Sequence, residues 1–130
     1  MASAAQTPID FEDVMMERDF SGSRAYGQSK LAQILFTVDL AEELRGAGVT
    51  AYSLHPATLM DTGMVEGAGV QPRTSVREGV EAVMNLVRDP GAASGQYFSG
   101  TRPARAHAQA YEPAAREKLR SLSLSLTGLR

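Results

Sequence analysis

The chain has 130 residues and a formal net charge of −2, from 13 basic and 15 acidic side chains. This is the length of one domain or part of one, and the charge balance predicts no nucleic-acid partner and no attachment to an anionic membrane. The sequence contains no cysteine and only two histidines, which excludes a disulfide framework and a cysteine-based zinc site, so no metal site is expected. Its apolar stretches fall far short of the roughly 18 residues that span a bilayer, and its start does not resemble a signal peptide, so a cytoplasmic protein is expected.

The first half of the chain carries one strong helical pattern. Residues 10–18 are expected to form a short helix with Asp10 as its cap. A much longer helix is predicted from about Arg24 to Arg45, and its exit is a glycine-rich turn at residues 46–48. Its apolar residues follow the i, i+3, i+4, i+7 spacing of one helical face: Leu31, Ile34, Leu35, Val38, Ala41 and Leu44.

A β-branched segment follows this helix. Residues 49–55 are predicted to form a buried strand that ends at Pro56. A helix, a tight turn and a strand form half of a βαβ unit, which implies a parallel sheet in an α/β fold. Residues 56–74 lack periodicity, and we expect a long loop that is functional or mobile.

The last third of the chain repeats the helix–strand order. A helix is predicted over about residues 76–88, ending at residues 89–91, and a short strand over residues 96–99. The tail from about Ala104 is expected to be helical, because four leucines share one helical face. The alternation at residues 122–126 also permits a strand, but the longer leucine pattern favours the helix: Leu119, Leu122, Leu126 and Leu129.

Tyr26 and Lys30 form the first candidate for chemistry. They lie four residues apart near the start of the long helix, which places them on one face, one turn apart. A free phenol has a pKa of about 10 and is a poor acid–base group at neutral pH, but an adjacent ammonium group stabilises the phenolate. A tyrosine in such an environment can exchange a proton with a carbonyl or alcohol oxygen. The alternative is an amphipathic tyrosine beside a solvated lysine.

The surroundings of this pair resemble the short-chain dehydrogenase/reductase family, in the branch that contains the retinol dehydrogenases and their bacterial relatives. The resemblance rests on the helix start Tyr26-Gly27-Gln28-Ser29-Lys30-Leu31-Ala32, the helix exit over residues 40–48, and the strand that runs into Pro56-Ala57-Thr58. It implies that residues 1–130 are the C-terminal half of a doubly wound Rossmann-type parallel sheet, a partial domain without the N-terminal nucleotide-binding strands. It also implies NAD or NADP as cofactor and a small-molecule carbonyl or alcohol substrate.

The resemblance assigns roles to individual residues. Tyr26 matches the general acid–base, and Lys30 matches the lysine that holds the nicotinamide ribose. Ser3 is the candidate for the catalytic serine, although it lies 23 residues before Tyr26 and the common family spacing is shorter; a frayed terminal serine is the alternative. Pro56 matches a cofactor-contacting proline, but Ala57 replaces the usual glycine. Thr62 best matches the threonine that follows, one position later than in the common pattern.

A second segment imitates the family's phosphate-binding loop. Residues 62–69, Thr-Gly-Met-Val-Glu-Gly-Ala-Gly, match its letter pattern. In such a loop the glycines follow a strand directly and open a long helix. Here residues 56–61 separate the strand from Thr62, and Pro72 follows, so we interpret the segment as a mobile lid.

The rest of a reductase is expected outside this sequence. A strand over residues 49–55 without its neighbour would leave an unpaired edge, and the long helix would expose its apolar face. We therefore expect an isolated chain that is poorly folded or forms a homo-oligomer. Besides a truncated oxidoreductase, two alternatives stay open: a non-catalytic dimerisation module, and half of a split reductase that pairs with a separate N-terminal half.

Overall fold

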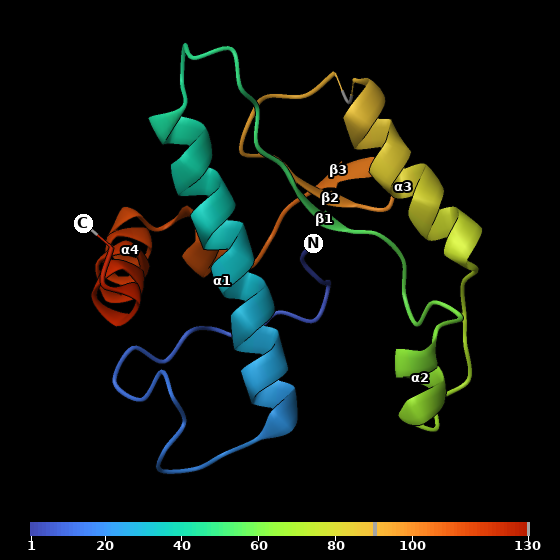
Figure 1. The fold of residues 1–130 in the computed structure, drawn as a ribbon, viewed down its shortest axis with the longest axis horizontal. Helices are drawn as coiled ribbons and strands as arrows, with labels where there is room; N and C mark the ends of the chain where they lie inside the picture. The colour runs from blue at the N-terminus through green and yellow to red at the C-terminus, as the bar shows by residue number, and fades with distance from the viewer. Residues whose placement is uncertain (90, 130) are drawn as a thin grey trace.

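The computed structural model describes residues 1–89 and 91–129, which form a three-stranded sheet with helices on both faces (Figure 1). This is an α/β arrangement, as predicted. The elements in chain order are α1 (Gly22–Glu43), β1 (Ser53–His55), α2 (Gly63–Gly67), α3 (Val76–Arg88), β2 (Tyr97–Ser99), β3 (Arg102–Ala104), the 3-10 helix η1 (Ala108–Tyr111) and α4 (Pro113–Thr127).

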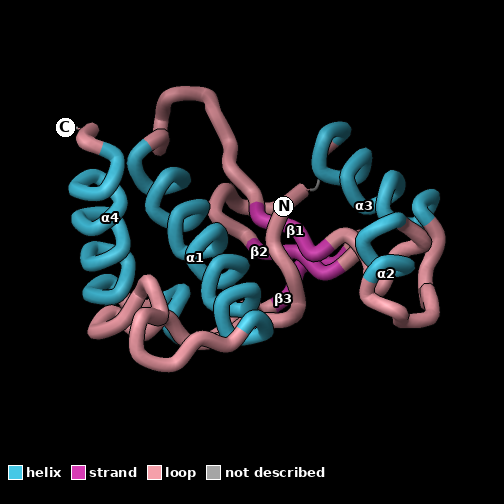
Figure 2. Tube along the Cα trace, turned by 60° about the horizontal axis from the view of Figure 1, so that its bottom comes forward, coloured by secondary structure: helices cyan, strands magenta, loops and turns pink. Residues whose placement is uncertain are grey.

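The strands lie in the order β1-β2-β3. β1 and β2 are parallel, with Leu54 opposite Phe98, which confirms the predicted parallel pair. β2 and β3 are antiparallel, with Phe98 opposite Pro103, so the sheet is mixed rather than purely parallel. Figure 2 shows α1 and α4 on one side of the strands and α3 on the other. Helices on both faces are compatible with part of a doubly wound sheet.

The long helix α1 confirms the strongest sequence prediction. The Ser21 hydroxyl accepts a hydrogen bond from the Arg24 amide and caps the first turn. After the helix, Gly46 and Gly48 have φ values of +83° and +72°, a conformation that favours glycine and allows the chain to turn back. Three residues of the predicted face are fully buried: Leu31, Ile34 and Leu35.

The predicted exposure of that apolar face is wrong. Leu31, Ile34 and Leu35 pack in one cluster with Ala2 and Ile9 from the start of the chain, and with residues near its end: Tyr97, Ala106, Ala110 and Ala115. The protein's own terminal segments therefore cover the face that a larger sheet was expected to cover. A second cluster on the other face of the sheet joins Leu54, Ala82 and Phe98.

β1 is shorter than the predicted strand over residues 49–55. It lies at an edge of the sheet, and its ladder with β2 joins three residue pairs. The Leu54 carbonyl on its other side accepts the Ala2 amide at 2.7 Å. Residues near the N-terminus therefore cover part of the edge that was expected to be unpaired, in the place where a neighbouring strand would lie.

The predicted helix over residues 10–18 is absent. Asp10 accepts the Glu12 amide, as the predicted cap would, but the Asp13 side chain accepts the amides of Glu17 and Arg18, which a helix would bond to backbone carbonyls. These local bonds stabilise consecutive turns instead of a helix. The loop predicted over residues 56–74 is also interrupted, by the five-residue helix α2.

The second half of the chain follows the predicted order with one addition. α3 begins with a capping box between Ser75 and Glu78 and ends at Arg88; the predicted exit at residues 89–91 includes Pro90, which lies outside the described residues. β2 lies where a strand was predicted. The tail contains β3 and η1 before α4 begins, because the segment around Pro103 pairs with β2. α4 confirms the helical interpretation of the leucine pattern.

Within residues 1–89 and 91–129, no helix combines the length and apolar character that a bilayer crossing requires.

Candidate active site

Tyr26 and Lys30 lie near the N-terminal end of α1, as the spacing predicts. The Lys30 ammonium nitrogen lies 5.4 Å from the centre of the Tyr26 ring. The Tyr26 side chain is 44% exposed and Lys30 is half-buried, so a small molecule can reach the pair. A cation over an aromatic face is favourable and holds the two side chains together. The structure therefore brings the two predicted residues to one accessible face.

Ser3 is buried rather than frayed. It is 6% exposed, and its hydroxyl oxygen accepts the Ala5 amide at 3.1 Å. Its carbonyl oxygen accepts hydrogen bonds from the Tyr97 hydroxyl and the Gln6 side-chain amide. The segment bearing Ser3 also contacts α1, since a side-chain carbon at Gly27 would overlap the Thr7 hydroxyl. Among the described residues, no hydrogen bond joins Ser3 directly to Tyr26.

Pro56 is buried at the carboxyl end of β1, where two hollows meet. An apolar groove of about 260 Å³ lies against α3, and a more polar cleft of about 510 Å³ lies next to His55. The His55 ring nitrogen Nε2 is 3.1 Å from the Thr58 hydroxyl, and burial lowers the pKa of His55. The groove residues besides Pro56 include Met1, Met60, Val76, Val80 and Met84. In open α/β sheets, ligands bind at the carboxyl ends of strands, which makes this edge a candidate ligand site.

Thr62 lies directly before α2, as its N-cap residue. Its hydroxyl donates to the Met60 carbonyl at 3.2 Å, and it makes no side-chain cap for α2. The segment that imitates a phosphate-binding loop forms α2, which has no buried residue and follows β1 only after seven residues. This geometry lacks the direct strand-to-helix turn that a pyrophosphate requires.

No sequence pattern indicates the hydrogen bonds that hold Ser3. Tyr97 lies in a segment with only a strand pattern, and no motif includes Gln6. Burial raises the pKa of the Tyr97 phenol, whose hydroxyl reaches a carbonyl 94 positions away in the sequence. No periodicity or spacing signals a contact of that separation. In the described part of the chain, no group of three histidine, aspartate or glutamate residues lies together as a metal site would require.

Comparisons with known proteins point to one enzyme family. Human retinol dehydrogenase 12 is 32% identical over 133 residues, a match covering 94% of this chain and 42% of the relative. Mouse retinol dehydrogenase 13 is 32% identical over 148 residues, covering 93% of this chain and 41% of the relative. The chain thus spans less than half the length of these curated relatives. No family model matches the chain.

A solved structure has the same fold over nearly the whole chain. It is the crystal structure of an uncharacterized protein from Mycobacterium paratuberculosis, with a TM-score of 0.70 and 25% sequence identity. The match covers 99% of this chain and 49% of that protein. The arrangement of helices around the short sheet is therefore similar to part of a larger protein.

Proposed function

The chain belongs to the short-chain dehydrogenase/reductase family, in the branch of the retinol dehydrogenases, and we propose that it supplies the acid–base part of an NAD- or NADP-dependent oxidoreductase. The reaction is the interconversion of a carbonyl compound and an alcohol. The observation that carries the proposal is the pairing of Tyr26 with Lys30 on an accessible face of α1, with 5.4 Å between the ammonium and the ring centre.

Tyr26 moves the proton in this reaction. In reduction, its phenol donates a proton to the carbonyl oxygen as that oxygen becomes a hydroxyl group, and in oxidation it takes the proton back. The positive charge of Lys30 stabilises the phenolate that remains after donation. Since Tyr26 is exposed and belongs to neither core cluster, a substrate can approach it without displacing a core residue.

Ser3 holds the substrate oxygen. Its hydroxyl oxygen accepts the Ala5 amide, which leaves the hydroxyl proton available for donation. A donor aimed at the reacting oxygen stabilises the negative charge that develops there.

The cofactor supplies the hydride when it is bound. Lys30 offers three donors that suit the hydroxyl groups of the nicotinamide ribose, and Pro56 and Thr62 would border the nicotinamide. The described residues fit only this end of the cofactor, because the exposed α2 segment lacks the geometry of a pyrophosphate loop. Contacts to the pyrophosphate and adenosine must come from residues other than these.

The apolar groove beside Pro56 would receive the nonpolar part of the substrate. Its lining is almost entirely carbon and sulfur, from side chains such as Val80 and Met84 of α3. Burial of apolar surface there favours a carbonyl or alcohol compound with a hydrocarbon chain. The names of the retinol dehydrogenases are consistent with this class of substrate.

The proposal is tested by measuring whether this chain binds the nicotinamide half of the cofactor and not the adenosine half. We expect nicotinamide mononucleotide, followed by NMR, to shift signals of Tyr26 and Lys30, whereas adenosine monophosphate shifts none of them. Lys30→Ala weakens this binding, and Gln33→Ala, an exposed change one turn further along α1, does not. Equal binding of the two nucleotides, or equal effects of the two substitutions, contradicts the proposal.

The comparisons lend no support to a purely non-catalytic interaction module. Homo-oligomerisation, a separate N-terminal half and a cytoplasmic location stay predictions from the sequence.

A further inference from the structure

The carbonyl oxygen of Ser3 is held by two side chains. The Tyr97 hydroxyl donates to it at 3.2 Å, and the side-chain amide of Gln6 donates to it at 2.9 Å. Tyr97 is 3% exposed, so its hydroxyl bond is shielded from water. A carbonyl oxygen has two lone pairs, and both are used here.

Gln6 is itself held by the C-terminal part of the chain. Its side-chain oxygen accepts the His107 amide at 2.7 Å, so that its amino group is the part that faces Ser3. Two residues after His107, Gln109 bonds both backbone groups of Ile9: its oxygen accepts the Ile9 amide at 2.7 Å, and its amino group donates to the Ile9 carbonyl at 3.1 Å. Hydrogen bonds from Gln6 and Ile9 thus hold residues 3–9 against the segment that precedes α4.

These side-chain hydrogen bonds hold Ser3 in place where the sheet contributes few hydrogen bonds. Beside β1, the residues next to Ser3 contribute one backbone bond, from the Ala2 amide to the Leu54 carbonyl. A catalytic hydroxyl must stay within about 0.5 Å of its productive position, which requires support from surrounding hydrogen bonds.

We propose that Tyr97 and Gln6 are positioning residues for the reaction described above, because they fix the backbone of Ser3 and thereby the direction of its hydroxyl. The inference rests on the proposed function, since it gives Ser3 the task of holding the substrate oxygen. Neither residue touches the substrate in this account. They act only through Ser3.

The test uses the full chain with two substitutions that each delete one donor. Tyr97→Phe removes only the hydroxyl, and Gln6→Glu replaces the amino group with oxygen while leaving an oxygen for the His107 amide. The matched control is Tyr52→Phe, since the Tyr52 hydroxyl also donates to a backbone carbonyl, that of Ala92 at 2.9 Å, in the other core cluster.

Two NMR readouts report on Ser3 directly. The carbonyl carbon shift of Ser3 reports its two accepted bonds, and hydrogen exchange at the Ala5 amide reports the bond to the Ser3 hydroxyl oxygen. We expect Tyr97→Phe and Gln6→Glu each to move the carbonyl shift and to speed Ala5 exchange about five- to tenfold, the ratio that corresponds to one hydrogen bond. Tyr52→Phe should leave both readouts unchanged.

Unchanged readouts in the two test variants overturn the inference, and so does an equal response in Tyr52→Phe, which would indicate general loosening of the fold. This result is separable from a failure of the proposed function. The proposed function fails if the parent chain does not bind nicotinamide mononucleotide in preference to adenosine monophosphate. That measurement does not depend on the two readouts at Ser3.

Discussion

The close approach of residues 3–9 to α1 makes Gly27 a sensitive position. Gly27 is buried in α1, directly after Tyr26. A Cβ atom placed there would overlap the Thr7 hydroxyl and would lie 2.9 Å from the Thr7 Cβ and 3.2 Å from its backbone nitrogen. Because Thr7 has a short, branched side chain, the clash can be relieved only by moving the backbone of one segment.

The expected effect of Gly27→Ala is the balance of two terms. The helix gains about 1 kcal/mol from replacing glycine by alanine in its interior. The overlap costs about 1–3 kcal/mol, as for other insertions into packed interiors. We therefore expect a net loss of about 1 kcal/mol in the free energy of unfolding. The matched control is Gly22→Ala in the same helix, where an added Cβ meets no atom within 4 Å.

Urea unfolding followed by circular dichroism gives the comparison. Gly22→Ala should be as stable as the parent or more stable by up to about 1 kcal/mol, and Gly27→Ala should be less stable than both. Thr7→Ala in the Gly27→Ala background should recover part of the loss, since the overlapping hydroxyl is then absent. The reasoning is refuted if the two glycine variants have the same stability, or if Thr7→Ala recovers nothing.

Two further predictions concern side chains away from Tyr26. Arg116, with a side chain 10% exposed, donates to Asp39 at 2.7 Å and to Glu42 at 3.2 Å, so Arg116→Met should lower the free energy of unfolding by about 2 kcal/mol. Arg120→Met, which breaks an exposed ion pair between the same two helices, should change it little, and equal losses would contradict this ranking. Burial lowers the pKa of His55 in the folded chain. Below about pH 6.5 the imidazole of His55 is therefore protonated more readily in the unfolded chain than in the folded chain. The free energy of unfolding falls as the pH falls from there toward the lower pKa of the folded state. Chemical unfolding at pH 7.5 and 5.5 should show a smaller pH dependence in His55→Gln, and an unchanged dependence would exclude His55 as its source.

The parts of the fold that local patterns determine were predictable. The apolar repeat along α1 and the glycines after it indicated both the helix and its end, and the four-residue spacing placed Tyr26 and Lys30 on one face. The parallel pairing of β1 with β2 followed from the helix–strand order. In each case the evidence lies within a short stretch of sequence.

The parts that failed depend on distant partners or on competing local bonds. Residues 10–18 carry a helical pattern, but Asp13 accepts two backbone amides that a helix would need. The apolar face of α1 was expected to be exposed, yet Ala106 and Ala110 from the far end of the chain cover it. The support of Ser3 by Tyr97 joins positions 94 residues apart, and no local pattern encodes it.

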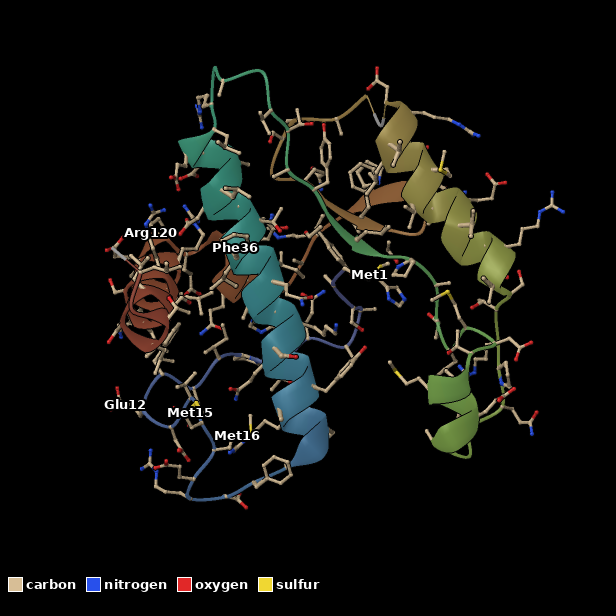
Figure 3. The ribbon with its side chains drawn as sticks, in the orientation of Figure 1. Met1, Glu12, Met15, Met16, Phe36 and Arg120 are labelled. Atoms are coloured by element: carbon tan, nitrogen blue, oxygen red, sulfur yellow. The ribbon has the colours of Figure 1, made fainter. Side chains whose placement is uncertain are left out.

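The central claim is that Tyr26 exchanges the proton of a carbonyl reduction. Its most direct test supplies the cofactor-binding contacts that the described residues lack. The part of the human relative that precedes the matched region is joined in front of this chain, and transfer of deuterium from deuterium-labelled NADH or NADPH to a long-chain aldehyde is measured. The aldehyde is chosen for the apolar groove, whose residue Met1 lies between α1 and α3 in Figure 3.

The account predicts that this chimaera forms the labelled alcohol, that Tyr26→Phe lowers the rate at least about 100-fold, and that Gln33→Ala leaves it unchanged. A Tyr26→Phe chimaera that transfers deuterium as fast as its parent would contradict the account.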